Sequence, residues 1–222
     1  VFIIQSTNPP SSNVLELLVM LDAARRASAN RVIAVVPYFG YARQDRKDEP
    51  RVPISARVLL DLMNVVGINR IMAMDLHSPQ IQGFINTPFD HLYSSMALFD
   101  RLKEFNLNFE NGVVLAPDVG SAKISQSYAK RLGVGFALID KRRPKPNEAK
   151  VAHIVGELKD KHVIIIDDMI DTAGTICNAA ETAMNKGASS VTAVGTHPVL
   201  SGESIRRLSD SPINKVIVCN TI

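Results

Sequence analysis

The sequence predicts an α/β protein whose mostly parallel sheets are covered by helices on both faces. Short apolar runs of strand length alternate with longer segments that have the helical period. The apolar runs are nearly continuous, which is typical of parallel strands buried on both faces. Hydrophobic residues make up 46% and charged residues 21% of the 222 residues, which is the balance of a folded chain and excludes a disordered one.

Eight runs are expected to be strands, and the six segments between them are expected to be helices. The expected strands are Phe2–Gln5, Arg31–Pro37, Arg70–Met74, Val113–Pro117, Gly135–Ile139, Val163–Asp167, Val191–Gly195 and Lys215–Cys219. The expected helices are Asn13–Ala29, Ile54–Val66, Ser94–Phe105, Ser121–Leu132, Thr172–Lys186 and Glu203–Leu208. The first run is expected to be buried, and both ends of the sequence read as cut from a longer chain.

A break in this alternation near Pro88–Tyr93 predicts two α/β domains. We place them at residues 1–90 and 91–222, and expect the first to be truncated at its start and the second at its end. Parallel sheets bind ligands at the carboxyl ends of their strands. The loops that follow the strands are therefore where functional residues are expected.

Composition excludes several classes of protein. Two cysteines cannot form a disulfide framework, which favours a reducing compartment such as the cytoplasm. No apolar run reaches the ~18 residues of a membrane helix. The net charge of +3 is too small to indicate a nucleic-acid partner, although the sequence pI is about 8.9.

The most specific pattern follows the expected strand Val163–Asp167. Asp167 and Asp168 end the strand, and a turn from Asp171 to Thr175 leads into a helix. The free amides of such a turn bind phosphate, and small residues let the phosphate approach the backbone. Three carboxylates would repel a phosphate unless they hold sugar hydroxyls or a Mg²⁺ ion, so a phosphorylated sugar fits both features. The alternative is a capped helix start with solvated aspartates.

Three further loops carry charged or metal-binding side chains. Cations gather in the first of these loops and suit a polyphosphate, although nearby acids make a solvated loop the alternative; they are Arg43, Arg46, Lys47 and Arg51. Asp75 and His77 follow the third expected strand and could bind a metal or a phosphate, whereas a structural histidine is the alternative. Asp118 follows the fourth expected strand and is either a ligand or a turn residue before an N-cap at Ser121.

A basic segment with two prolines, Lys141–Asn147, breaks the alternation and is expected to be a mobile, exposed loop. Together with the loops above, it gives the whole chain a strong resemblance to the phosphate-regulated class of ribose-phosphate diphosphokinases. The residues that carry the resemblance are Gln5–Thr7, Pro37–Asp45, Asp75–His77, Gln80–Phe84, Pro117–Asp118, Asp167–Met169 and Asp171–Thr175. The Asp167–Thr175 segment alone is shared with phosphoribosyltransferases.

The resemblance implies two tandem phosphoribosyltransferase-like domains and Mg²⁺-dependent transfer of the diphosphoryl group of ATP to ribose 5-phosphate. Lys141 and Arg143 are implied to be catalytic. The implied ATP-binding residues are Arg43, Gln44, Asp48 and His77. The implied metal ligands are His77 and Asp118, with Asp75, Asn86 and Asp90 as further candidates. The implied ribose 5-phosphate-binding residues are Arg143, Asp167, Asp168, Asp171, Thr172, Ala173, Gly174 and Thr175.

The resemblance also implies partners. The chain is implied to form a homo-oligomer, a hexamer of dimers. Phosphate and ADP are implied as regulators, because Thr196–Gly202 resembles a segment near the regulatory site of the family. Two alternatives stay open. A phosphoribosyltransferase would not need the Arg43–Gln44 and Asp75–His77 loops. A non-catalytic associated subunit would be altered around the basic segment, whereas Lys141 and Arg143 are present here.

Overall fold

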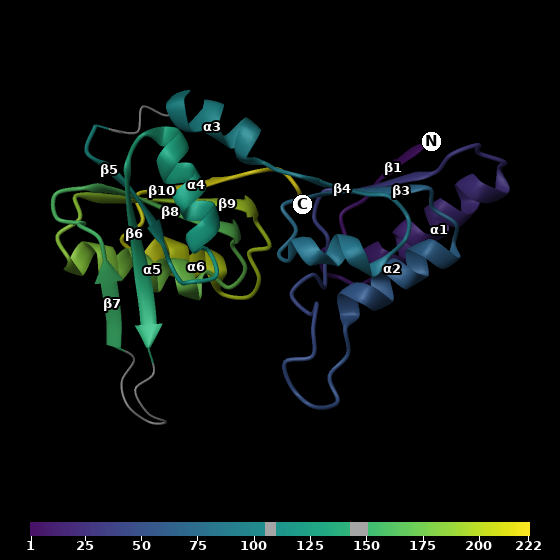
Figure 1. Cartoon of the computed structure of the whole chain (residues 1–222), viewed down its shortest axis with the longest axis horizontal. Helices are drawn as coiled ribbons and strands as arrows, with labels where there is room; N and C mark the ends of the chain where they lie inside the picture. Colours follow the sequence, from purple (N-terminus) through teal and green to yellow (C-terminus); the bar gives the residue numbers. More distant parts are fainter. Residues whose placement is uncertain (105–109, 143–150) are drawn as a thin grey trace. The chain divides into compact units, whose positions relative to one another are not determined.

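The structure is a computed structural model that describes residues 1–104, 110–142 and 151–222 (Figure 1). The chain divides into two compact units. Unit 1 comprises Val1–Ser94 with Thr221–Ile222, and unit 2 comprises Ser95–Asn220. Each unit has its own sheet and its own hydrophobic core. No helix in the described residues is long and apolar enough to span a lipid bilayer.

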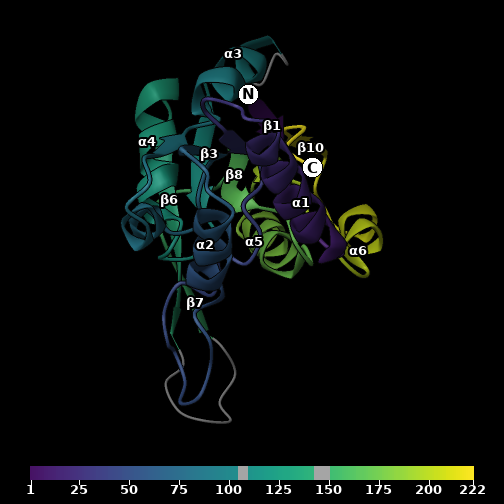
Figure 2. The same ribbon diagram turned by 90° about the vertical axis from the view of Figure 1, so that its right-hand side faces the viewer.

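Unit 1 is built on a four-stranded parallel sheet in the order β1-β2-β3-β4. Its strands are β1 (Phe2–Ile4), β2 (Ile33–Val36), β3 (Arg70–Met74) and β4 (Phe89–Leu92). Its helices are α1 (Ser12–Arg26), α2 (Ser55–Val65) and the short 3₁₀ helix η1 (Pro79–Phe84). Leu21 of α1, Leu60 of α2 and Ile71 of β3 share one buried cluster, so both long helices cover the same face of the sheet and lie side by side (Figure 2).

Unit 2 contains a six-stranded sheet in the order β10-β9-β8-β5-β6-β7. Its strands are β5 (Gly112–Ala116), β6 (Gly135–Arg142), β7 (Val151–Val155), β8 (His162–Met169), β9 (Ser190–His197) and β10 (Lys215–Val218). Its helices are α3 (Ser95–Glu104), α4 (Ala122–Leu132), α5 (Gly174–Asn185) and α6 (Ser204–Asp210). Val113 and Leu115 share a core with α5, whereas Val114 shares one with α3 and α4. Helices therefore cover both faces of this sheet, as Figure 1 shows.

The predicted α/β class with mostly parallel sheets is confirmed, and the described strand pairs are parallel except for β6 with β7. The sequence patterns do not predict β4, which lies where a break between domains is expected, or β7, which is short and lies at a sheet edge. They also misjudged β1. Phe2 is 64% exposed because in the edge strand β1 it is the alternate residue Ile3 that packs against the core.

The basic segment begins differently from the expected loop. Strand β6 continues through Lys141 and Arg142, whose backbone pairs with β7 at Ala152 and Val151. The ladder extends because residues from a neighbouring edge strand satisfy the backbone groups of β6, a gain that the polar side chains do not signal. The rest of the predicted loop, including Arg143, lies outside the described residues.

Candidate active site

The candidate sugar-phosphate residues of unit 2 lie at the carboxyl ends of neighbouring parallel strands. Asp167 and Asp168 are near the end of β8, and Asp118 lies two residues beyond β5. Strands β5 and β8 pair directly, with Leu115 opposite Ile165. The pairing brings Asp118 to the same edge of the sheet as Asp167 and Asp168, which lie far from it in sequence, and parallel sheets bind ligands at this edge.

These carboxyl groups are close enough to change one another's protonation. Burial, together with the negative charges of Asp168 and Asp118, raises the pKa of Asp167 to about 8. The backbone N–H of Asp168, which donates to Asp167 Oδ1 at 3.0 Å, acts in the opposite direction. Asp167 therefore retains a proton at neutral pH unless a cation or hydrogen-bond donors approach it.

Asp118 also shapes its own loop. Its Oδ1 accepts hydrogen bonds from the backbone N–H of Ser121 at 3.0 Å and from the Ser121 hydroxyl at 3.2 Å. Ser121 directly precedes α4. The structural alternative raised for Asp118, a turn residue before a helix, is therefore present in the structure. It leaves the second carboxylate oxygen, Oδ2, outside these two bonds.

The turn from Asp171 to Thr175 connects β8 with α5. Ala173, which is buried, adopts φ = 62°, a left-handed conformation that costs an L-residue about 1–3 kcal/mol. Helix α5 begins at Gly174, so the unpaired amides of its first turn lie in the predicted phosphate-binding segment. A strained backbone at a helix start is a common feature of ligand-binding turns.

Two side chains that sequence reasoning did not single out hold this turn in place. The Ser201 hydroxyl donates to Asp171 Oδ1, and Arg207 Nη1 donates to the carbonyl of Thr172 at 3.0 Å. Gly195 of β9 is needed beneath the turn, since a Cβ there would lie 2.8 Å from Ile170 Cγ1. Ser201 and Arg207 are 30 and 35 residues from the turn residues that they bind, so no local motif signals them.

In unit 1, the Arg43–Asp48 loop follows β2 and its turn. Arg43 and Asp48 are exposed, and Gln44 is half-buried. Gln44 Nε2 donates to the carbonyl of Arg46 at 3.3 Å and to Asp48 Oδ1 at 3.4 Å. Upstream, Gly40 packs so tightly on Thr7 that a Cβ at Gly40 would lie 2.1 Å from the Thr7 carbonyl oxygen.

The Asp75–His77 loop follows β3. Asp75 is buried at φ = 38°, and its carboxylate accepts hydrogen bonds from the N–H and hydroxyl of Ser94. The N–H of Leu76 donates to His91 Nε2 at 2.9 Å, and burial lowers the pKa of His91. His77 itself is exposed. Hydrogen bonds to Asp75 and Leu76 therefore hold the loop, while His77, the predicted metal ligand, faces solvent.

The remaining metal candidates are placed unequally. Both carboxylate oxygens of Asp90 accept from Arg70 Nη1 at 2.7 Å, and Asn86 is exposed. Over residues 1–104, 110–142 and 151–222, no three His, Cys, Asp or Glu side chains are grouped to hold a metal ion. Lys141 is the penultimate residue of β6 and pairs with Ala152 of β7, and Arg143 lies outside the described residues.

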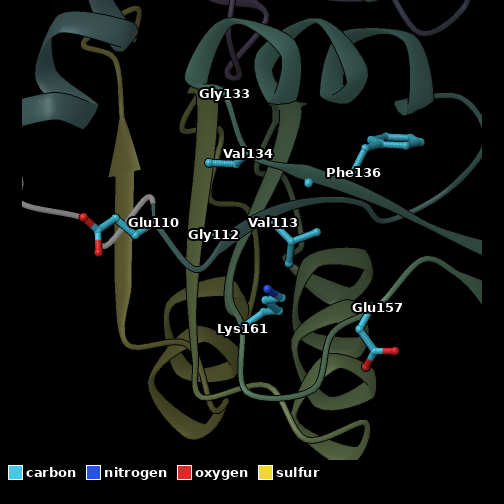
Figure 3. Close-up of a pocket in the computed structure, with 9 residues that line it drawn as sticks. Glu110, Gly112, Val113, Gly133, Val134, Phe136, Glu157 and Lys161 are labelled. Carbon is cyan, nitrogen blue, oxygen red and sulfur yellow. The ribbon is translucent and has the colours of Figure 1, made fainter.

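A shallow pocket of about 250 Å³ lies at the opposite edge of the sheet in unit 2 (Figure 3). Residues at the amino ends of parallel strands line it, among them Gly112 of β5, Gly135 of β6 and Lys161 before β8. Lys161 Nζ donates to Asn111 Oδ1 at 2.5 Å. The pocket is therefore distinct from the strand-end residues described above.

Comparisons with known proteins agree over the whole chain. Residues 1–67 match the N-terminal domain of ribose phosphate pyrophosphokinase, and residues 141–222 match the phosphoribosyl synthetase-associated domain. A ribose-phosphate pyrophosphokinase of Chlorobaculum tepidum is 53% identical over all of this chain and 68% of the relative's length. A Helicobacter pylori ribose-phosphate pyrophosphokinase is 51% identical over all of this chain and 70% of its own length.

A solved structure gives the same result. The phosphoribosylpyrophosphate synthetase of Mycobacterium smegmatis is 39% identical, with a TM-score of 0.92 over all of this chain and 72% of that chain. The fold, the strand-end loop and these relatives define an α/β transferase. Within that class, the chain belongs to the ribose-phosphate pyrophosphokinase family.

Proposed function

We propose that the chain transfers the diphosphoryl group of ATP to the 1-hydroxyl of ribose 5-phosphate, giving phosphoribosyl pyrophosphate and AMP for nucleotide biosynthesis. One observation carries the proposal. Asp118, Asp167 and Asp168 crowd at a sheet edge directly before the amide-rich turn 171–175. Carboxylates and amides in that order suit the hydroxyls and the phosphate of one sugar phosphate. The relatives' shared name supports this reading.

In the proposed reaction, Asp167 and Asp168 accept hydrogen bonds from the ribose hydroxyls. Hydroxyl donors would favour the ionised form of Asp167, whose pKa is raised in their absence. The 171–175 turn binds the 5-phosphate through backbone amides and the hydroxyls of Thr172 and Thr175. The positive end of the α5 dipole lies at the same place and favours a bound anion.

The nucleotide is assigned to unit 1. Arg43 supplies a planar cation for phosphate, and Gln44 and Asp48 supply an amide and a carboxylate that can read a base. His77 is assigned to the triphosphate. The exposure of Arg43, Asp48 and His77 supports these roles, since all three are accessible to a ligand.

The residues present fit a Mg²⁺ ion, because Mg²⁺ prefers oxygen ligands and the crowded carboxyl groups of unit 2 suit a divalent cation. Asp118 and His77 are the first candidates to hold Mg²⁺. Asp75 and Asp90 are weaker candidates, since Ser94 and Arg70 already bind their carboxylates, and Asn86 is a further candidate. Bound Mg²⁺ would neutralise part of the triphosphate charge.

Lys141 and Arg143 are the proposed catalytic residues. Cations placed at the transferred group stabilise the charge that develops in the transition state of phosphoryl-type transfer. The backbone position of Lys141 supports its role, because β6, the strand that carries Lys141, pairs over Gly135–Leu138 with β5, which leads to Asp118. Arg143 follows two residues later and would also contact ribose 5-phosphate.

The cellular setting is part of the proposal. Neither cysteine forms a disulfide bond, which suits the cytoplasm. We expect a homo-oligomer, a hexamer of dimers, with phosphate and ADP as regulators. Sedimentation analysis and assays across millimolar phosphate would check these expectations, and neither a monomer nor a phosphate-independent rate would fit them.

The central test mixes the protein, MgCl₂, ATP and ribose 5-phosphate and follows products by ³¹P NMR. AMP and phosphoribosyl pyrophosphate should form together, and only when both substrates are present. ADP in place of AMP would indicate an ordinary kinase. Release of diphosphate from phosphoribosyl pyrophosphate on adding a free nucleobase would indicate a phosphoribosyltransferase. A protein that binds both substrates without turnover would indicate the non-catalytic alternative.

A further inference from the structure

The Arg43–Asp48 loop has no helix or strand of its own, so something else must fix its shape. The carboxylate of Asp45 lies in the middle of this loop. Asp45 Oδ2 accepts a hydrogen bond from the Ser78 hydroxyl at 2.5 Å and another from Gln80 Nε2 at 3.0 Å. Both donors belong to a segment 33 or more residues further along the chain. One carboxylate oxygen therefore connects two loops within unit 1.

The donors are placed next to a predicted ligand. Ser78 directly follows His77 and precedes η1, which begins at Pro79. Ser78 is buried, so its hydroxyl cannot exchange Asp45 for water without cost. A hydrogen bond to an ionised group contributes about 1.5–3 kcal/mol. Asp45 therefore holds Ser78, the residue after His77, through a hydrogen bond that is costly to break.

The charge of Asp45 also matters. Asp45 lies among Arg43, Arg46 and Lys47 in the sequence. A carboxylate that faced a bound triphosphate there would repel the triphosphate. The Asp45 carboxylate instead accepts hydrogen bonds from Ser78 and Gln80, which satisfy its negative charge within unit 1. The neighbouring cations keep their charge for the nucleotide, and the loop keeps its shape.

We propose that Asp45 is a positioning residue for ATP, which aligns the Arg43–Asp48 loop with His77 by binding Ser78 and Gln80. The inference rests on the proposed function of this site, in which Arg43, Gln44 and His77 hold ATP. Asp45 does not itself need to touch the nucleotide. Its removal should therefore weaken ATP binding while ribose 5-phosphate binding in unit 2 is unchanged.

The test compares Asp45→Ala and Asp45→Asn with the wild-type chain. Asp45→Ala should raise the KM for ATP about tenfold, the effect of about 1.4 kcal/mol, and leave the KM for ribose 5-phosphate within about twofold. Asp45→Asn keeps one oxygen that can accept both hydrogen bonds, so its KM for ATP should lie between those of the wild type and Asp45→Ala. Asp61→Ala, which removes an exposed carboxylate paired with Arg57 on α2, is the matched control and should change neither KM.

The Ser78→Ala variant completes the design. If Asp45 acts through Ser78, the Asp45→Ala/Ser78→Ala double variant should bind ATP hardly worse than Asp45→Ala alone. Ser78→Ala also substitutes for Asp45→Ala should that variant fail to fold by circular dichroism. An unchanged KM for ATP, an equal rise in both KM values, or strict additivity of the two substitutions would overturn the proposal.

The test separates this inference from the proposed function. Calorimetric titration with MgATP measures ATP binding whether or not turnover occurs. A wild-type chain that binds MgATP but forms no AMP contradicts the proposed function alone. An active wild-type chain whose Asp45→Ala variant binds MgATP normally contradicts the positioning role alone.

Discussion

The candidate residues of unit 2 lie at the ends of buried parallel strands, whereas those of unit 1 lie on irregular loops joined by side-chain hydrogen bonds. In unit 2 the β5–β8 pairing alone brings Asp118 near Asp167. In unit 1 the loops depend on bonds such as Asp45 to Ser78. The comparison indicates that sheet pairing fixes the residues proposed to bind the sugar phosphate, while individual polar contacts fix those proposed to bind the nucleotide.

The two regions also differ in how their carboxylates are neutralised. Asp90 of unit 1 is held by Arg70, and Asp75 by Ser94. In unit 2, Asp167 is pressed against the like charges of Asp168 and Asp118, and its pKa is raised. Buried, mutually repelling carboxyl groups are therefore crowded together in unit 2. We infer that a cation contributes more there than at Asp90.

The largest expected effect concerns catalysis and leaves both regions folded. Lys141→Ala should lower kcat by about 10²–10³, the typical effect of losing one group that stabilises transition-state charge. Substrate KM values should change far less. Steady-state kinetics measures kcat and KM, and circular dichroism checks the fold. The control is Lys159→Ala, which changes an exposed lysine before β8. Near-normal turnover of Lys141→Ala would refute the catalytic assignment.

The second prediction compares carboxylates from the two units. Asp118→Asn should raise the MgCl₂ concentration for half-maximal rate by about tenfold or more, because it removes charge where carboxylates are crowded. Asp90→Asn should shift it by less than about twofold, because Arg70 already neutralises Asp90. Magnesium titrations of the two variants decide between them. Equal shifts would contradict the contrast between the units.

The sequence reveals the strand-end residues of unit 2 more readily than the contacts that support them. Asp167, Asp168 and the 171–175 turn form one contiguous segment, so a local pattern of buried strand, carboxylates and small residues is enough to find them. Ser201, Arg207 and His91 act across 15 to 35 residues, and only tertiary packing brings them to their partners. Short edge strands such as β4 were missed for the same reason, because pairing rather than propensity forms them.

The third prediction concerns the contact that holds the sugar-phosphate turn. Ser201→Ala removes the hydroxyl that donates to Asp171 Oδ1. Because the sheet ends and Arg207 still hold the turn, the KM for ribose 5-phosphate should rise only about three- to tenfold, roughly the effect of one hydrogen bond. The KM for ATP should stay constant. Ser209→Ala, on α6, is a matched control, and a selective rise in the KM for ATP would argue against the division of roles between the units.

The last prediction concerns a pH dependence of stability that arises in unit 2. The pKa of Asp167 is raised from 3.8 to about 8, so between these values the folded chain binds a proton that the unfolded chain has lost. The resulting stabilisation is fully present below pH 3.8 and is lost as the pH rises through about 8. Each kcal/mol lost should lower Tm by about 2–4 °C for a chain of this size.

Thermal unfolding of the wild type and of Asp167→Asn, without Mg²⁺, measures this contribution. Asn has nearly the same shape as Asp but no charge, so Asp167→Asn should reduce the fall in Tm between pH 6 and about 9. Ribose 5-phosphate should also reduce the fall in Tm of the wild type. Its hydroxyl donors favour the ionised carboxylate, so the bound ligand stabilises the folded chain more as the pH rises. Asp100→Asn, on α3 and away from the strand ends, is the control and should keep the wild-type slope. If Asp167→Asn kept that slope as well, the crowded carboxyl groups would not be the source of the pH dependence, and the electrostatic contrast between the two units would lose its main support.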